Sequence, residues 1–357
     1  MSVAPTPTRK PTPTPLPTLT LAPPPFFTAT GSMRTNRDDA TATLLNDGKV
    51  LIAGGTFESV PLATAELYDP ETGAFTPTGS MTETRAGHTA TLLQDGRVLI
   101  AGGSDYHAGP GVYDSAETYD PATGRFTKTR PMTTARDSHT ATLLKNGLVL
   151  LASGISNDGY LATAELFNPT TNTFTATGSM KAARALASAT LLQDGRVLIA
   201  GGRISDAPSE EGDILKSAEI YNPNTGEFTS AGSMTYRRSS FAATLLRNGL
   251  VLVAGGDNVT ADGGMLTTAE LYDPSTNKWT ETGSMAGSRA EMTATLLLDG
   301  RVLVVGLGAE LYDPAIGKFS SAAEMKENRI RQTATLLPDG RVLIAGGASN
   351  TAELYWP

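Results

Sequence analysis

Short apolar runs such as Val50–Ala53 and Val98–Ala101 recur along the chain, separated by polar and turn-forming residues. Successive positions in each run are apolar, which is typical of a strand that is covered on both faces. The segment before each run, such as residues 41–45, combines threonine and alanine with leucine. An Asp-Gly or Asn-Gly pair joins the two segments, and this is the strongest short signal for a β-hairpin because both turn residues are expected to take positive φ. The pattern therefore predicts an all-β chain.

One unit containing this hairpin is repeated. It reads Thr-Ala-Thr-Leu-Leu-x-Asp-Gly-Arg-Val-Leu-Ile-Ala-Gly-Gly, a variable loop, then Thr-Ala-Glu-Leu-Tyr-Asp-Pro-x-Thr-Gly-x-Phe-Thr-x-x-Gly-Ser-Met-x-x-x-Arg. Its double glycine is found at Gly54-Gly55, Gly102-Gly103, Gly201-Gly202, Gly255-Gly256 and Gly346-Gly347, and in altered form at Ser153-Gly154 and Gly306-Leu307-Gly308. The unit thus occurs seven times, and a period of roughly fifty residues is typical of propeller blades and solenoid repeats.

Each unit predicts four strands. In the first complete unit they cover residues 41–45, 50–53 and 65–68 and a last strand at Phe75. The turn between the third and fourth strands, Asp69-Pro70-Glu71-Thr72-Gly73, has the proline and glycine of a tight turn. A four-stranded meander of this size cannot bury both faces alone, so the sheets are expected to stack around an axis, with the small residues of the first strand innermost.

The two ends of the chain complete one blade. The last unit has three strands, at residues 333–337, 341–345 and 351–355, and no fourth, whereas residues 26–33 read as a fourth strand without the other three. Pairing residues 27–30 with residues 351–355 would remove two exposed strand edges. We therefore expect an all-β, closed seven-bladed β-propeller of four-stranded antiparallel blades over residues 26–357.

These motifs resemble kelch repeats. The resemblance rests on the double glycine, on Tyr-Asp-Pro at the end of the third strand, on Met-x-x-x-Arg and on an aromatic residue in the fourth strand. The aromatic residues are Phe75, Phe126, Phe174, Phe228, Trp279 and Phe319. Because this residue is mostly Phe and the blades are nearly identical, the chain is similar to bacterial kelch-repeat proteins and to the propeller of galactose oxidase.

Residues 1–25 differ from the rest in composition. They are mostly proline and threonine, which prevents helix or sheet and favours an extended, disordered tail or linker. Such a tail suits display of the propeller outside the cell or at its surface, although a tail without a role and a cytoplasmic location stay open.

Charge and cysteine content exclude several classes of partner. The net charge is −8 and no cluster of Lys and Arg interrupts it, so we expect no nucleic-acid partner. The apolar runs are too short for a membrane span, and we expect no membrane insertion within this chain. The chain contains no cysteine, whereas galactose oxidase resembled above needs one at its copper. We accordingly expect no cofactor and lean against an enzyme, with a carbohydrate-active or oxidative enzyme left as the alternative.

Seven arginines and seven glutamates recur with the unit. The arginines follow the methionines and could form a ligand ring, as in some animal kelch domains, but a buried carboxylate needs a partner and we interpret the two sets as structural ion pairs. They are Arg37, Arg85, Arg136, Arg184, Arg238, Arg289 and Arg329, with Glu66, Glu117, Glu165, Glu219, Glu270, Glu310 and Glu353.

The variable loops identify the candidate binding face. Connections after the second and fourth strands emerge on one side of the ring, which we call the variable face, and function usually resides in such loops on a rigid scaffold. Candidate ligand-binding residues there are Phe57, His88, Tyr106, His107, His139, Tyr160, Arg203, Tyr236, Phe241, Asn258 and Arg331. Imidazole is a common metal ligand, yet His88 and His139 occupy a place where kelch repeats often carry a structural histidine, so we predict no metal site.

These observations together predict a non-catalytic binding module. We expect a monomeric propeller that presents its variable face to a protein, peptide or glycan. A sensor domain of a longer surface protein is a further alternative.

Overall fold

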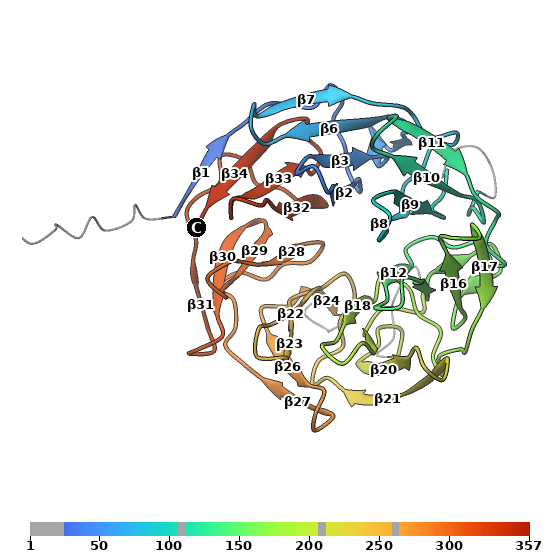
Figure 1. The fold of residues 1–357 in the computed structure, drawn as a ribbon. Helices are drawn as coiled ribbons and strands as arrows, with labels where there is room; N and C mark the ends of the chain where they lie inside the picture. Colours follow the sequence, from blue (N-terminus) through green and yellow to red (C-terminus); the bar gives the residue numbers. More distant parts are fainter. Residues whose placement is uncertain (1–24, 106–110, 206–211, 259–263) are drawn as a thin grey trace, which may run out of the picture.

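Seven four-stranded antiparallel sheets stand side by side in a closed ring (Figure 1). The structure is a computed structural model that describes residues 25–105, 111–205, 212–258 and 264–357. The sheets confirm the predicted seven-bladed β-propeller, and we number the blades one to seven in the order of their first strands. The predicted tail falls almost entirely outside the described residues, so its extent stays a prediction.

Each blade contributes one strand to each of four concentric positions. The first, innermost strands are β2 (Thr41–Leu44), β8 (Thr89–Leu92), β12 (Thr140–Leu143), β18 (Ser188–Leu191), β22 (Ala242–Leu245), β28 (Thr293–Leu296) and β32 (Gln332–Leu336). The second are β3 (Val50–Ala53), β9 (Val98–Ala101), β13 (Val149–Ala152), β19 (Val197–Ala200), β23 (Val251–Ala254), β29 (Val302–Gly306) and β33 (Val342–Gly346). The third are β6 (Ala65–Asp69), β10 (Ala116–Asp120), β16 (Ala164–Asn168), β20 (Ser217–Asn222), β26 (Ala269–Asp273), β30 (Gly308–Asp313) and β34 (Ala352–Trp356). The outermost are β7 (Ala74–Pro77), β11 (Arg125–Lys128), β17 (Thr173–Ala176), β21 (Glu227–Ser233), β27 (Lys278–Glu281), β31 (Lys318–Ser321) and β1 (Phe26–Ala29).

Three of the variable loops carry small hairpins that the sequence pattern does not predict. They pair β4 (Thr56–Phe57) with β5 (Val60–Pro61), β14 (Ile155–Ser156) with β15 (Gly159–Tyr160), and β24 (Asp257–Asn258) with β25 (Gly264–Met265). No helix that could cross a membrane occurs in the part of the chain that the structure describes.

The Asp-Gly turns differ in one detail from the expected geometry. At the first of them only Gly48 has positive φ, at 85°, and Asp47 does not. Gly48 N–H donates to the Leu45 carbonyl at 3.0 Å, while the Asp47 carboxylate accepts the Lys49 N–H at 3.1 Å. The side chain of the aspartate thus holds the turn, and one left-handed residue is enough to reverse the chain.

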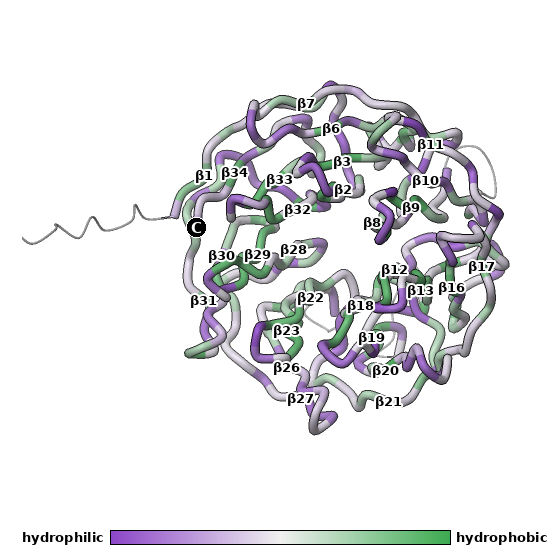
Figure 2. Tube along the Cα trace, in the orientation of Figure 1, coloured by the Kyte–Doolittle hydropathy of each residue, from purple (hydrophilic) through white to green (hydrophobic). Residues whose placement is uncertain are grey.

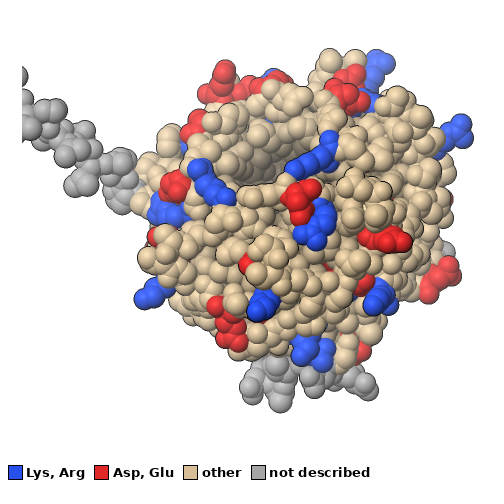
Figure 3. Space-filling model, turned by 60° about the horizontal axis from the view of Figure 1, so that its bottom comes forward, with Lys and Arg blue, Asp and Glu red and all other residues tan. Residues whose placement is uncertain are grey.

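The second strands form the apolar middle of each blade (Figure 2). All four residues of β3 are buried, as the continuous apolar run predicts. First strands of neighbouring blades lie next to one another around the axis, and the space-filling view shows the ring hollowed at its centre, with acidic and basic side chains around the rim (Figure 3).

The core is divided among the seven seams between blades. One cluster of buried side chains fills each seam, such as Val50 and Tyr68 of blade one packed with Leu343 of blade seven. Tyr68 is fully buried and its hydroxyl bonds to the Thr30 hydroxyl of blade seven at 2.9 Å. Because every sheet needs both neighbours to cover its faces, the fold depends on closure of the ring.

The N-terminal strand closes the ring as predicted. β1 pairs antiparallel with β34 in the register Phe26 with Trp356, Phe27 with Tyr355, and Ala29 with Glu353. Phe27 is 8% exposed and its ring lies 5.0 Å from that of Tyr355. The first and last described strands of the chain therefore share one sheet.

Candidate functional site

Seven buried ion pairs join the connections on the variable face to the third strands. Each arginine lies in the connection that enters a blade, and its glutamate lies in the third strand of that blade. Every one of these side chains is at most 6% exposed. The Nη2–Oε1 distances are 3.2 Å for Arg37–Glu66, 3.4 Å for Arg85–Glu117, 3.1 Å for Arg136–Glu165, 3.0 Å for Arg184–Glu219, 2.8 Å for Arg238–Glu270 and 3.3 Å for Arg329–Glu353, and Arg289 pairs with Glu310 in the same way.

The same groups also hold the backbone of the variable face. In blade four, Arg184 Nη1 donates to the carbonyls of Gly201 at 2.8 Å and Ser217 at 2.9 Å. The carboxylate of Glu219 accepts the Lys181 N–H at 2.9 Å. Burial lowers the pKa of Arg184, and the charge of Glu219 opposes that shift. The arginines thus fix the ends of the variable loops, and their charge is not presented to solvent.

Three of the candidate ligand residues are inside the seams. His88, His139 and Phe241 are only 6–8% exposed. Each is the residue just before a first strand, where it packs on the glycine that ends the second strand of the preceding blade: a Cβ on Gly54 would lie 2.5 Å from His88 Cε1, and one on Gly201 2.6 Å from Phe241 Cε1. These side chains therefore occupy equivalent packing positions in different blades.

The two buried histidines are neutral at ordinary pH. His88 Nε2 lies 3.1 Å from the Thr41 hydroxyl, and His139 Nε2 lies 3.0 Å from the Thr89 hydroxyl. Burial, with a smaller contribution from the nearby arginine charges, lowers the pKa of each to about 3. Among the described residues there is no group of three His, Cys, Asp or Glu side chains placed to hold a metal ion.

Seven other residues form a ring at the axis on the variable face, which we call the axial ring. Each lies two positions after one of the seven buried arginines and has φ between 51° and 63°. They are Asp39, Gly87, Ser138, Leu186, Ser240, Glu291 and Arg331. Five backbone hydrogen bonds of 2.9–3.2 Å run from blade to blade through this ring, the first from the Ser138 N–H to the Gly87 carbonyl and the last from the Arg331 N–H to the Glu291 carbonyl.

The axial ring combines a uniform backbone with different side chains. None of its members is buried. Left-handed φ is unfavourable for a residue such as Leu186, and backbone strain of this kind tends to cluster at functional sites. The ring therefore presents a rigid frame with a separate side chain from each blade.

The charged side chains of the axial ring lie close together on one side of it. Arg331 Nε and Nη2 donate to the two carboxylate oxygens of Glu291, both at 2.8 Å, and Nη1 lies 3.6 Å from Asp39. Asp38, Asp137 and Asp257 also interact electrostatically with this group. Although 42% of the Asp39 side chain is exposed, burial of its carboxyl among these residues raises its pKa to about 6, against the opposing effect of Arg331.

The other candidates lie in the variable loops or outside the described residues. Phe57 is 38% exposed at the tip of the β4–β5 hairpin, and Tyr160, Arg203, Tyr236 and Asn258 are half-buried. Tyr106 and His107 lie outside the described residues. The structure brings Arg331 to the axis and leaves Phe57 and Tyr160 on separate hairpins of the same face.

Exposed apolar side chains also favour this face. Ten large apolar residues are exposed in the described chain, and six of them are in the connections of the variable face. They are Phe57, Val60, Ile204, Met265, Leu307 and Ile330. Exposed apolar side chains are typical of an interaction surface where they form a contiguous patch.

Comparison with known proteins agrees with the repeat geometry. The family model for the Kelch motif matches residues 41–82, 186–235 and 237–286. The chain is a kelch-repeat β-propeller. Kelch-like protein 40 of Xenopus tropicalis is 31% identical over 96 residues, which are 27% of this chain and 15% of that protein. The chain thus spans a small part of that relative's length.

A solved structure has the same fold as the kelch propeller. It is a fungal alcohol oxidase of the AA5 family in complex with copper, with a TM-score of 0.75 and 17% identity over 93% of this chain and 76% of the other. At that identity the likeness concerns the fold alone.

Sequence reasoning did not identify most of the kelch propeller's axial ring. Only Arg331 was among the candidates, because the others are ordinary surface residue types. A usable signal is present, however: the residue two positions after the repeated arginine differs in almost every blade, while its surroundings recur.

Proposed function

We propose that this kelch propeller is a non-catalytic binding module that holds a protein or peptide partner over the axial ring. The observation that carries the proposal is the ring itself, in which one backbone conformation displays Asp, Gly, Ser, Leu, Ser, Glu and Arg side chains around one axis. A rigid scaffold with variable side chains suits recognition, because little conformational entropy is lost on binding. Kelch-repeat propellers typically mediate protein interactions, and the exposed apolar residues in the connections of the variable face support the same proposal.

The charge of the site suggests the kind of partner. The carboxylates of Asp38, Asp39, Asp137, Asp257 and Glu291 form one electrostatic group with the guanidinium groups of Arg203 and Arg331. Complementary charge guides specificity and association. A basic segment of a protein is therefore the preferred partner, and a glycan is the alternative ligand.

Peptide and glycan arrays would test this proposal with one matched pair of variants. The site variant, Asp39→Asn with Glu291→Gln, removes two carboxylates from the axial ring. The control, Asp95→Asn with Asp194→Asn, removes two exposed carboxylates from the turns on the opposite face. We expect the site variant to weaken binding of basic peptides at least about tenfold and the control to change it less than about twofold. Equal binding by both variants would contradict the proposal, as would a ligand that binds the turn face.

The raised pKa of Asp39 favours a second candidate function, that of an enzyme in which the pKa of a carboxyl group lies near the pH at which the enzyme acts. Groups with strongly shifted pKa values in a cleft are candidates for acid–base chemistry. Incubation with an oligosaccharide library would show products that disappear in Asp39→Asn if this candidate holds. Binding without turnover would leave the binding module as the function.

We also propose that the propeller acts as a monomer outside the cell. The proline- and threonine-rich composition of residues 1–25 supports display on a tether. Protease treatment of intact cells would digest the propeller if it is exposed, and sedimentation would give its oligomeric state.

A further inference from the structure

Blade six differs from the other blades in the connection between its second and third strands. β29 ends at Gly306 and β30 begins at Gly308, so Leu307 alone forms the connection. In blade one the corresponding strands end at Ala53 and begin again at Ala65. The short turn of blade six lacks the chain that covers this place elsewhere.

The missing chain leaves one terminal nitrogen of a buried arginine without a hydrogen-bond partner. In the six other blades, Nη1 of the buried, ion-paired arginine donates two hydrogen bonds of 2.7–3.1 Å to backbone carbonyls at the ends of the connection. The Arg289 side chain is only 6% exposed. Its Nη1 is buried and has no hydrogen-bond partner. An unsatisfied buried donor is unfavourable by roughly 1–3 kcal/mol, and more for a charged group.

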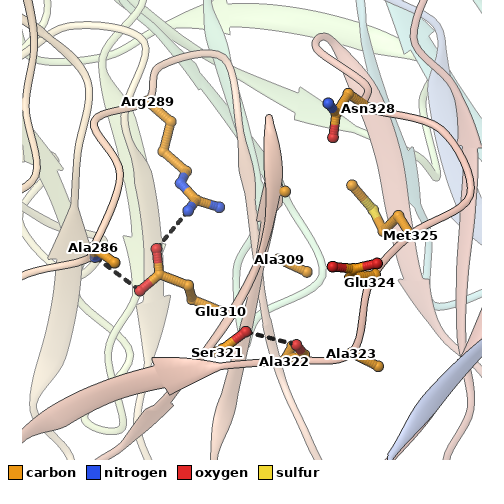
Figure 4. Close-up of a pocket in the computed structure, with 11 residues that line it drawn as sticks. Ala286, Arg289, Ala309, Glu310, Ser321, Ala322, Ala323, Glu324, Met325 and Asn328 are labelled. Carbon is orange, nitrogen blue, oxygen red and sulfur yellow. Dashed lines mark hydrogen bonds and ion pairs between the residues drawn. The ribbon is translucent and has the colours of Figure 1, made fainter.

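A pocket of about 460 Å³ lies beside this group. We call it the blade-six pocket; it is lined by Arg289, Gly308, Glu310, Ala323, Glu324 and Met325, among others. In Figure 4 one terminal nitrogen of Arg289 is bonded to Glu310, while the other faces the space between Arg289 and Met325. The pocket therefore occupies the place that a variable loop takes in the other blades.

The opposite wall of the pocket is also left uncovered. Met325 is half-buried, whereas its six counterparts are at most 5% exposed. The counterpart Met81 donates its backbone N–H to the Ala63 carbonyl in the connection of blade one at 2.9 Å. Met325 has no such bond within the described chain. Both walls of the blade-six pocket thus lack the hydrogen bonds that the main chain of the connection provides in the other blades.

The charges around the pocket define what could replace that chain. Arg289 is already paired with Glu310, so its free donors suit neutral oxygens, as they do in the other six blades. Glu324 is exposed on the rim and has no ion pair among the described residues. Its negative charge disfavours a carboxylate ligand and favours a cation.

We propose that the blade-six pocket binds a short peptide segment whose main-chain carbonyl oxygens accept the hydrogen bonds of Arg289 Nη1 and whose basic side chain pairs with Glu324. The inference deepens the proposed function, because the pocket is formed by connections of the variable face. The peptide would restore the contacts that the loop makes in the other blades, and its lysine or arginine would give it sequence preference.

Methyl NMR of the whole chain labelled at methionine tests this directly. The probes are acetyl-Gly-Lys-Gly-amide and acetyl-Gly-Glu-Gly-amide, with acetate as a plain carboxylate, and the Met325 methyl signal is assigned with Met325→Leu. We expect the lysine peptide to shift this signal saturably and the glutamate peptide to bind at least about fivefold more weakly. Glu324→Gln should weaken the lysine peptide about two- to fivefold, and Glu71→Gln on the turn face should not.

A loop graft provides the second arm. Residues 154–163 of blade three, in place of Leu307–Gly308, would supply Arg289 with the counterpart of the Thr163 carbonyl that accepts from Arg136 Nη1 and close the pocket without changing its charged residues. We expect the graft to abolish the Met325 response and raise the melting temperature; Ala323→Leu fills the pocket if the graft does not fold. The proposal is overturned if the Met325 signal of the parent protein shows no saturable shift with the lysine peptide at up to about 10 mM, a concentration that would reveal even weak binding. A filled pocket that binds as the parent does also overturns it, whereas loss of array binding in the axial-ring variant bears on the proposed function alone.

Discussion

Arg184 is the ion-pair partner of Glu219 at 3.0 Å and, through its other terminal nitrogen, the donor that holds the Gly201 and Ser217 carbonyls. Both side chains are at most 5% exposed. One guanidinium therefore links a third strand, the end of a second strand and the variable loop between them.

Replacing Arg184 with alanine should destabilise the propeller strongly. Loss of one partner leaves Glu219 as a buried, uncompensated charge, and such changes lower the free energy of unfolding by roughly 3–5 kcal/mol. Phe57→Ala is the control, because this exposed side chain should change stability by no more than about 0.5 kcal/mol. Urea midpoints at equal slope give the comparison, and an Arg184→Ala midpoint equal to the parent's would show that the pair is not structural.

Removal of the N-terminal strand should open the ring. Deleting residues 1–33 removes β1 and exposes the edge of β34, and the loss of buried Phe27 alone is worth roughly 3–5 kcal/mol. Deleting residues 1–23 leaves every described strand pair in place. Thermal melts should therefore separate the two truncations, and similar melts would argue against closure by β1.

Acid should destabilise the protein through His88 and His139. Their pKa values are about 3 in the folded chain and near 6.5 when unfolded, so the unfolded state binds more protons as pH falls below 6.5. Each histidine should reduce stability by up to about 2 kcal/mol at pH 5. The variant with both histidines changed to phenylalanine, the residue at the equivalent position 241, should lose less stability between pH 7 and pH 5 than the parent. Parallel pH profiles would refute the burial of neutral histidines.

Arg331 should control the protonation of the Asp39 carboxyl group in the axial ring. Its charge lowers the pKa of Asp39, so Arg331→Ala should move that pKa above its present value of about 6. Carbon NMR of the Asp39 carboxyl measures the shift. The side chains of this pair are 45% and 42% exposed, so stability should change by less than about 1 kcal/mol. An unchanged Asp39 titration would mean that solvent screens the pair.

The repeat made the scaffold predictable. Seven copies of one pattern fixed the strands, the ring closure and the Arg–Glu pairs, because each copy supports the same reading of turns and apolar runs. The hairpin turn was predicted less well: the Asp47 side chain supports the turn, so that only Gly48 needs positive φ.

The binding side of the molecule was less predictable for a physical reason. His88 and Phe241 precede first strands and look like loop residues in the sequence, but the absence of a side chain on Gly54 and Gly201 lets them turn into the seams. Arg289 Nη1 likewise has no hydrogen-bond partner because the connection between the second and third strands of blade six is too short to cover it. Such properties arise from contacts between distant segments, which a repeated pattern does not encode.

Closure by β1 has a mechanical consequence. Phe26 pairs with Trp356 at the end of a third strand, on the turn face, and β1 runs from there toward the variable face. Tension between the N-terminal end and a partner held over the axial ring would act along β1 and load its hydrogen bonds to β34 in shear, together instead of one after another. The stacked rings of Phe26 and Trp356, 5.7 Å apart, lie where that load enters. Under such a load, the strand that seals the ring would also be the strand that transmits the force.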